Sequence, residues 1–414
     1  MEALAQTNVF LPNFAALEGK RSAEPSWLAG RRRASIERFQ ELDFPTAKSE
    51  EWRYTSVGPI VATPWVLSRA ERGQPMLQTP SLPAGVRVAR LKDVLAIDPE
   101  RLQPYLSKIA GSEKSAFTAL NTAFFEDGLL VEIARGAVVD TPIEIQFDSS
   151  GLNGPVVSHP RCLVVAAEGS QATVVERYAG QGAYFQNSIT EIVLDSGAGL
   201  SHIKLQQEDT AAYHVHTIAV TQGRASRFTS HNIALGAALA RTDLTVELAS
   251  EGAECRLDGI FLGSGAQHLD NHTSIDHAMP HGTSRELYKG ILDGRARGVF
   301  HGKIIVRPNA QKTDAMQTNK NLLLSREALV NSTPALEIFA DDVKCKHGST
   351  IGQLDANALF YLRSRGIGEE ESRALLTWAF ASDVAERIPV PSVRAELQRA
   401  LGQRLPGGGP EAIR

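Results

Sequence analysis

Cysteine is scarce in this sequence, which has three, Cys162, Cys255 and Cys345, spread widely over 414 residues. An odd, sparse set is not typical of a disulfide framework, so the reducing cytoplasm is the simplest compartment. No apolar run approaches the roughly 20 residues that a membrane helix needs. The first residues, MEALAQTNVFLPNF, lack a basic start followed by an apolar core. We therefore expect neither a membrane span nor a signal peptide.

Positive charge is not in excess. The formal net charge is -4 and the isoelectric point is near 6.3, which argues against general nucleic-acid binding because that function needs a basic surface. The sequence also has no G-x-x-x-x-G-K-[ST] phosphate loop, no G-x-G-x-x-G and no G-x-S-x-G. These absences weaken nucleotide hydrolysis and acyl transfer as functions of this chain, and we expect it to bind no nucleotide itself.

The residues that are present indicate two or three structural units, because 414 residues exceed one ordinary core and 43% of them are hydrophobic. We predict a helical N-terminal domain over residues 1–126. Apolar residues recur at near-helical spacing over residues 14–55, and a second helical stretch reaches Phe124. Between the two stretches, residues 58–85 contain five prolines and are expected to be irregular.

A β-rich core is predicted over residues 127–353, where short strand-like runs are broken by glycine turns. Leu244, Val246 and Leu248, for example, alternate with polar residues. From Gly223 onward the turn glycines are separated by 13 and 16, then 13 and 17 residues, so the pair of steps repeats about every 29–30 residues. Such strands fit a sandwich, a barrel or a β-solenoid, and the length of the segment favours the solenoid, whose two ends need caps.

Helical spacing returns over residues 354–404, which we predict to be a C-terminal helical domain. Asp355 can cap a first helix that Gly366 ends, and a second helix begins near Glu369. The second helix carries Leu375, Trp378 and Phe380, and such an apolar face can anchor a partner protein or pack within its own domain. Both interpretations stay open. The glycine-rich tail, residues 405–414, is expected to be disordered.

The segment Val343–Gly348 is the sharpest candidate site. On an extended strand Cys345 and His347 share one face, with Lys344 and Lys346 on the other. Cysteine and neutral histidine suit iron, zinc or iron–sulfur centres, and we expect the lysines to favour the thiolate. Two ligands do not complete a four-coordinate site, so the remainder would come from elsewhere. The alternative is a buried cysteine beside a surface histidine.

A second concentration of polar residues lies at Asp270–His281 and contains three histidines, at positions 272, 277 and 281. It could bind a metal, but the spacing of the histidines matches no helical metal motif. On one strand the side chains of His272 and His277 would also point to opposite faces. We therefore favour the interpretation that these are polar residues lining the solenoid. His214 and His216 share a strand face and are expected to form a hydrogen-bonded pair in the interior or at an interface. Asn319 and Asn321 are expected to form an amide ladder between coils.

Several segments resemble the SufB/SufD family of iron–sulfur cluster assembly scaffolds, from about Phe44 to Leu401. Within that family the chain is most similar to SufD, because of Lys48–Tyr54, the modest length and the few cysteines. The most specific matching segments are Gly302–Val306, Ala310–Ala315, Asn319–Ser325, Pro334–Ile338, Asp342–Gly348 and Tyr361–Ile367.

The resemblance implies a fold and a set of partners. The fold is a right-handed parallel β-helix flanked by N-terminal and C-terminal helical domains. The implied partners are SufB, paired through the β-helix, and the ATPase SufC, docked on the C-terminal helices. His347, and less firmly Cys345, would contribute to a transient iron–sulfur cluster shared with SufB, and the isolated chain could form a homodimer. The resemblance therefore implies a scaffold subunit and not an enzyme.

Two rival functions are left. One is a β-helical carbohydrate-active enzyme, although no pair of acids stands out. The other is a stand-alone metalloenzyme that uses the His272–His281 region.

Overall fold

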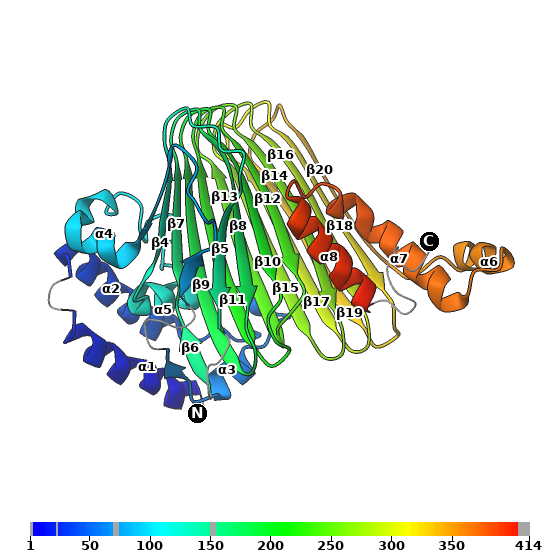
Figure 1. The fold of residues 1–414 in the computed structure, drawn as a ribbon, viewed down its shortest axis with the longest axis horizontal. Helices are drawn as coiled ribbons and strands as arrows, with labels where there is room; N and C mark the ends of the chain where they lie inside the picture. The colour runs from blue at the N-terminus through cyan, green and yellow to red at the C-terminus, as the bar shows by residue number, and fades with distance from the viewer. Residues whose placement is uncertain (1–2, 22–23, 69–73, 150–154, 405–414) are drawn as a thin grey trace.

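The molecule is a long β-solenoid with helices at both ends (Figure 1). The computed structural model describes residues 3–21, 24–68, 74–149 and 155–404. The solenoid spans residues 128–352 in about eight turns. The solenoid predicted from turn spacing is therefore confirmed, and the sandwich and the barrel are excluded. The predicted tail, residues 405–414, lies outside the described residues.

Two sheets form the solenoid, and successive long strands alternate between them. One sheet, called sheet A here, contains β4 (Gly128–Ile133), β7 (Arg161–Ala166), β9 (Tyr184–Leu194), β11 (Tyr213–Gln222), β13 (Leu239–Leu248), β15 (His268–His277), β17 (Arg297–Val306) and β19 (Leu329–Ile338). The other, sheet B, contains β5 (Ile143–Asp148), β8 (Gln171–Ala179), β10 (Gly199–Gln206), β12 (Arg227–Ala234), β14 (Glu254–Gly263), β16 (Thr283–Leu292), β18 (Asp314–Leu323) and β20 (Lys344–Gly352). These strands pair in parallel within each sheet.

The register confirms the predicted repeat. In sheet A, Leu239 pairs with His268 and His268 pairs with Arg297, so each coil there takes 29 residues. Gly265 and Gly294 occupy equivalent turns with positive φ, 59° and 63°, which is a backbone conformation that glycine adopts without steric cost. The glycine spacing seen in the sequence is therefore the spacing of coil corners.

The core of the solenoid is built by alternation along each strand. On β13, Leu244, Val246 and Leu248 face the interior and are buried, whereas Thr245 and Glu247 face outward. Each buried leucine-sized side chain contributes roughly 1.5–3 kcal/mol. Because every coil adds such residues to one continuous cluster, the stability of a coil depends on the coils stacked beside it.

The N-terminal elements cover the outer face of sheet A. They are α1 (Ala3–Glu18), α2 (Ser26–Leu42), η1 (Glu50–Trp52), α3 (Gly58–Ala62), α4 (Leu91–Ile97), η2 (Pro99–Arg101) and α5 (Ala116–Phe124). Phe39 and Phe117 from these helices pack with Phe185 and Val215 of the sheet. The expected irregularity of residues 58–85 needs correction, because short strands there join the sheets. These are β1 (Val66–Leu67), β2 (Pro75–Leu77) and, next to them, β3 (Val86–Arg90), while β6 (Val156–Ser158) pairs with β1.

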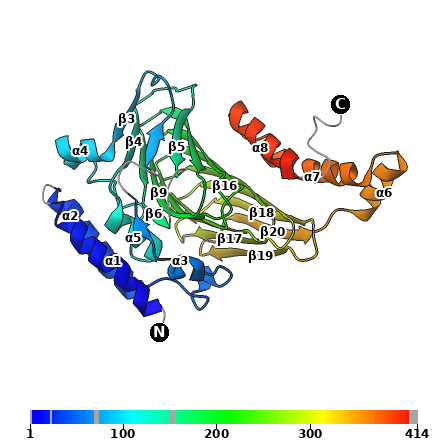
Figure 2. The same cartoon turned by 60° about the horizontal axis from the view of Figure 1, so that its bottom comes forward.

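The C-terminal helices lie on the opposite side, against sheet B (Figure 2). They are α6 (Ala356–Ser364), α7 (Glu369–Ala385) and α8 (Pro391–Arg404). Asp355 caps α6 as predicted, accepting a hydrogen bond of 2.8 Å from the backbone N–H of Asn357. Val384, Leu397 and other residues of α7 and α8 are buried against the sheet, whereas α6 projects beyond the end of the solenoid. No helix among the described residues is long and apolar enough to cross a membrane.

Candidate functional site

The C-terminal end of the solenoid is open. β19 and β20 are the last strands of their sheets, and in the described part of the chain each pairs on one side only, with β17 and β18 respectively. Ile338, Phe339 and Ile351 are exposed there. Two long strands therefore offer unpaired backbone N–H and C=O groups beside apolar side chains, and such an edge is a template for pairing with another chain.

Cys345 and His347 lie on this open end. Both are on β20, where Cys345 pairs in register with Ala315 and His347 with Gln317. Ala315 belongs to the interior core and Cys345 packs against it, so this face of β20 continues the solenoid interior. Cys345 is half-buried and His347 is exposed, because no further coil covers the strand.

Burial raises the pKa of the Cys345 thiol, and a backbone hydrogen bond from Ala315 only partly opposes this effect. The expectation that Lys344 and Lys346 would favour the thiolate is therefore wrong. The alternation of the strand directs their side chains to the other face, away from the sulfur. A metal that binds Cys345 must first displace its proton.

The interior next to this end is polar. Asn321 donates to Asn319 Oδ1 at 2.5 Å, Asn319 donates to the Tyr288 carbonyl at 3.1 Å, and Ser332 on β19 donates to Asn319 Oδ1 at 2.7 Å. Ser332 also contacts Ser349 of β20 at 2.7 Å, which links the two sheets in the last coil. The two amides share the interior face as predicted, but they bond to each other within β18 and reach the next coil only through the Tyr288 carbonyl, so they do not form the expected ladder between coils.

Gln317, the register partner of His347, donates to Glu286 at 2.7 Å one strand further in. Burial raises the pKa of Glu286 to about 7, although hydrogen bonds with Thr273 and Gln317 act in the opposite direction. A carboxyl that is hard to ionise therefore lies two strands behind His347.

The histidines of the Asp270–His281 region do not converge. His277 faces the interior and contacts Ser284 Oγ at 2.9 Å, whereas His281 lies in a turn with φ of 61°. His272 faces outward, which corrects the expectation that it lines the interior. Among the described residues no group of three or more His, Cys, Asp or Glu side chains is arranged to hold a metal ion, and the stand-alone metal site in this region is therefore not supported.

An ion-paired cluster forms around His272 instead. Its Nε2 is 3.1 Å from Asp270 and its Nδ1 is 3.3 Å from Glu51, which η1 brings onto the outer face of sheet A. Burial alone would lower the pKa of His272, but Asp270 and Glu51 raise it to about 9. Arg241 binds Asp270 at 2.9 Å and lies 3.7 Å from the ring centre of Trp52. The Lys48–Tyr54 segment is therefore fastened to the solenoid.

His214 and His216 are buried in the interior, as expected for a hydrogen-bonded pair. His214 lies 2.8 Å from Glu208, and His216 lies 3.1 Å from Thr190. Cys162 and Cys255 are buried as well, and burial raises the pKa of both thiols well above the usual value. None of these side chains is accessible to a partner.

On the C-terminal helices, Trp378 and Phe380 are partly buried and pack against the cluster between α7 and sheet B, and Leu375 is partly exposed. The most exposed aromatic side chains here are on α6 instead: Phe360 is 73% exposed and Tyr361 is 57% exposed. Sequence inspection missed this pair. The available signal was two adjacent aromatics in a short helix with no apolar stripe to bury them.

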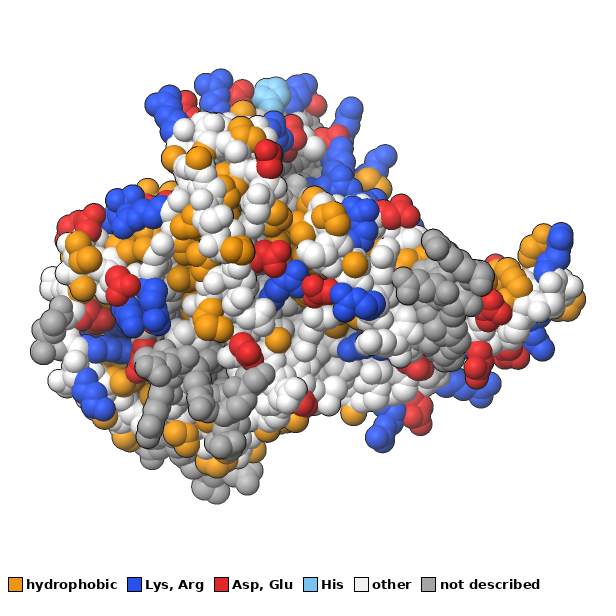
Figure 3. Space-filling view, viewed as in Figure 1, with side chains coloured by type: hydrophobic (Ala, Val, Ile, Leu, Met, Phe, Trp, Pro, Cys, Tyr) orange, Lys and Arg blue, Asp and Glu red, His pale blue; other side chains and the backbone are white. Residues whose placement is uncertain are grey.

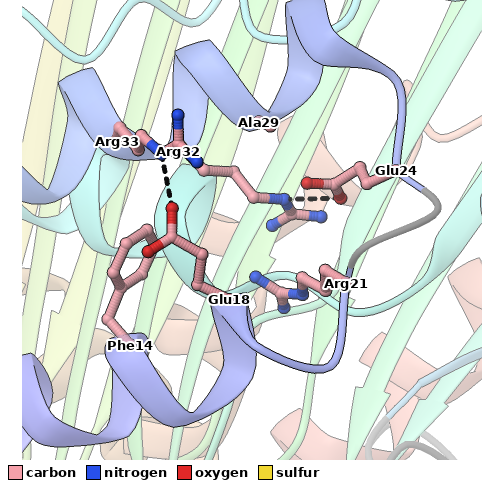
Figure 4. Close-up of a pocket in the computed structure, with 7 residues that line it drawn as sticks. All are labelled: Phe14, Glu18, Arg21, Glu24, Ala29, Arg32 and Arg33. Atoms are coloured by element: carbon pink, nitrogen blue, oxygen red, sulfur yellow. Dashed lines mark hydrogen bonds and ion pairs between the residues drawn. The ribbon is translucent and has the colours of Figure 1, made fainter.

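A hollow of about 160 Å³ lies between α1 and α2 (Figure 4). Arg32 is buried there; it binds Glu24 at 2.8 Å and donates to the carbonyls of Thr122 and Ala123 at the end of α5. Arg21 donates to the Ala123 carbonyl at 3.1 Å. Burial lowers the pKa of Arg32 to about 9. Because these guanidinium groups bind a helix C-terminus, the hollow has a structural role.

Comparisons with known proteins agree with this geometry. A family model described as "SUF system FeS cluster assembly, SufBD core domain" matches residues 147–380, and one described as "SufBD protein N-terminal region" matches residues 72–145. The chain belongs to the SufBD family. The resemblance noted in the sequence is thereby confirmed, and this SufBD protein is a component of the SUF system of iron–sulfur cluster assembly.

Relatives of this SufBD protein cover almost its whole length. The iron–sulfur cluster assembly SufBD family protein of Synechocystis sp. is 32% identical over 92% of both chains. SufD of Escherichia coli is 30% identical over 90% of this chain and 92% of its own, and SufD of Bacillus subtilis is 23% identical over 92% and 95%.

Proposed function

We propose that this chain is a SufD-like scaffold subunit that pairs with SufB through the open end of the solenoid. The observation that carries the proposal is the pair of unpaired edges on β19 and β20, with exposed Ile338, Phe339 and Ile351 beside them. A second β-solenoid could continue both sheets by backbone hydrogen bonds and cover the apolar residues. In the absence of that partner, a second copy offers the same edges, so the isolated chain is expected to form homodimers.

The same end supports a role in cluster assembly. His347, and less firmly Cys345, would bind a nascent iron–sulfur cluster, which is the cargo of the system. Two ligands from one chain leave a four-coordinate iron incomplete, so the subunit paired at this end would supply the others. The chain would therefore act as a non-catalytic scaffold.

Replacing His347 with alanine tests this role. The complex of the variant with its SUF partners should assemble but show a reduced anaerobic absorption of the iron–sulfur cluster, because an exposed ligand is removed without loss of core packing. His281→Ala is the matched control, since His281 is also exposed but lies in a distant turn. Unchanged cluster content in an intact His347→Ala complex would exclude the ligand role.

The C-terminal helices are the proposed docking surface for the ATPase SufC. Phe360 and Tyr361 of α6 would form the contact, and Leu375, Trp378 and Phe380 of α7 would lie on or behind it. Large exposed aromatic side chains are the kind of residue that dominates binding energy when a partner buries them.

A double substitution, Phe360→Ser with Tyr361→Ser, should abolish co-purification of the ATPase and leave the thermal stability of the chain nearly unchanged, because both side chains are exposed. Ile97→Ser is a control, since Ile97 is 85% exposed on α4 at the other end. Undiminished co-purification of the ATPase with the double variant would contradict docking on α6.

A further inference from the structure

A groove of about 380 Å³ lies on the outer face of sheet B, beside the C-terminal end of α7. Its floor includes Leu287, Met316 and Thr318, and its walls carry Arg256, Arg285, Lys320 and Arg387. The groove exists because α7 and α8 cover apolar outer residues such as Ile260 and Ile291 but leave the first halves of β14, β16 and β18 uncovered.

Two ion pairs hold α7 beside the groove. Arg387 binds Asp258 at 2.8 Å, and Lys289 binds Asp383 at 2.6 Å while donating to the Phe380 carbonyl at 2.6 Å. Asp258 is buried and also accepts from Arg256 at 2.8 Å, so one carboxylate faces two guanidinium groups. These contacts fix the wall of the groove and leave positive charge in excess at its mouth.

The remaining cations are accessible. Arg285 pairs with Asp314 at 2.8 Å, but both side chains are more than 40% exposed, so the pair is weak and exchangeable. Lys320 is exposed and has no ion pair among the described residues. The register continues the row of Arg256 and Arg285 through Met316 to Lys346 on β20, which is also exposed. Figure 3 shows Lys and Arg side chains along the upper right edge of the solenoid, where these strands lie in Figure 1.

The spacing of the cations selects the kind of ligand. Lys320 is four residues beyond Met316 on β18, and Met316 is the register neighbour of Arg285. At roughly 3.3 Å per residue, about 13 Å of strand therefore separates Lys320 from the level of Arg285. One phosphate group cannot contact both. An extended acidic segment could place carboxylates at both levels, with an apolar side chain on Met316, which is 47% exposed at the level of Arg285.

We propose that this groove binds an acidic segment of a partner protein, with Arg285 and Lys320 contacting its carboxylates and the exposed Met316 contacting one of its apolar side chains. The site is distinct from the open end and from α6, so it does not depend on the function proposed above. Nucleic acid is disfavoured because the whole chain carries a net charge of -4.

Fluorescence anisotropy on the full chain tests the proposal, with a labelled Asp-Glu-Leu-Glu-Asp-Leu-Glu-Glu peptide as probe. Arg285→Ala with Lys320→Ala should weaken binding of the peptide roughly tenfold or more, since two charge-assisted contacts are lost. Arg135→Ala with Arg224→Ala removes the same charge from two turns where both side chains are more than 70% exposed, and it should have little effect. Higher salt should weaken the wild-type complex.

Three results would overturn the proposal. The first is that the peptide fails to bind at low salt. The second is that the two double variants lose affinity for the peptide equally, which would indicate nonspecific electrostatic attraction and not a defined site. Inorganic phosphate or an oligothymidylate could compete with the peptide at lower concentration than unlabelled peptide does, which would indicate a different ligand. Circular dichroism of both variants establishes that they are folded, because all four substituted side chains lie on the surface.

Discussion

Substitution of Glu286 by glutamine is expected to stabilise the folded chain above pH 7, because the buried carboxyl of Glu286 resists ionisation. The residue is 4% exposed, and burial raises its pKa from 4.5 to about 7. The folded state therefore holds the proton more tightly than the unfolded state. The free energy of unfolding falls as pH rises from 4.5 to 7 and stays reduced above that range.

The magnitude follows from the shift. One pKa unit corresponds to about 1.4 kcal/mol, so ionising Glu286 costs the folded state about 3 kcal/mol at pH 8. Glutamine avoids this cost while keeping the shape of the side chain. Its carbonyl can accept the 2.7 Å hydrogen bond from Gln317, and its amide can keep the hydrogen bond that Glu286 makes with Thr273.

Urea unfolding followed by far-ultraviolet circular dichroism measures the effect at pH 5 and pH 8. The Glu286→Gln variant should match the wild type near pH 5 and exceed it by about 3 kcal/mol at pH 8. Glu327→Gln is the control, because Glu327 is exposed on a turn and should leave stability unchanged at both values. A Glu286→Gln variant no more stable than the wild type at pH 8 would refute the reasoning.

Two further substitutions probe other buried charges. His272→Gln is expected to lower the free energy of unfolding by up to about 3 kcal/mol at pH 6. The reason is that Asp270 raises the pKa of His272 to about 9 against the effect of burial. The stability that this shift contributes is present below pH 6.5 and is lost as the pH rises through 9. An equal loss at pH 6 and pH 9.5 in urea unfolding would contradict it. Arg161→Met should cost about 3–5 kcal/mol, because it removes the cationic partner of Glu191, 3.0 Å away and fully buried, and leaves that carboxylate only the backbone N–H groups of Ser107, Ile109 and Ala110. Adding Glu191→Gln should recover part of that loss, and a single-variant loss below about 1 kcal/mol would show that the pair is not needed.

The sequence predicted the solenoid because its coils obey local rules. Alternation on β13 and glycine spacing at Gly265 and Gly294 both follow from strand and turn geometry within one coil. The Asp355 cap and the amide pair Asn319 and Asn321 were likewise predictable, since each depends on neighbours in the chain.

What the sequence could not reveal depends on surfaces far apart in the chain. In the sequence, His272 is one more residue of a strand. Its contact with Glu51, 221 positions earlier, is visible only in the folded structure, where both lie on the outer face of sheet A. The basic groove has the same origin: Arg256, Arg285 and Lys320 come together only when three coils are stacked in register. The alternation of side chains along a strand indicates which residues share a face of the sheet, but not whether another part of the chain covers that face.

Cys345 shows how position in the stack decides chemistry. It continues an interior row that runs through Cys255, Ser284 and Ala315. Cys255 is closed in by neighbouring coils and its pKa is well above the usual value, while Cys345 is half-buried because the stack ends there. A partner solenoid added at this end would bury Cys345 as its own coils bury Cys255. The thiol would then resist ionisation more strongly. In the proposed complex, the charge of the thiolate would therefore have to be compensated by iron and not by solvent. In that proposed complex, His347 on the same face and ligands from the partner would complete the coordination of that iron, which would make subunit pairing and cluster binding coupled steps.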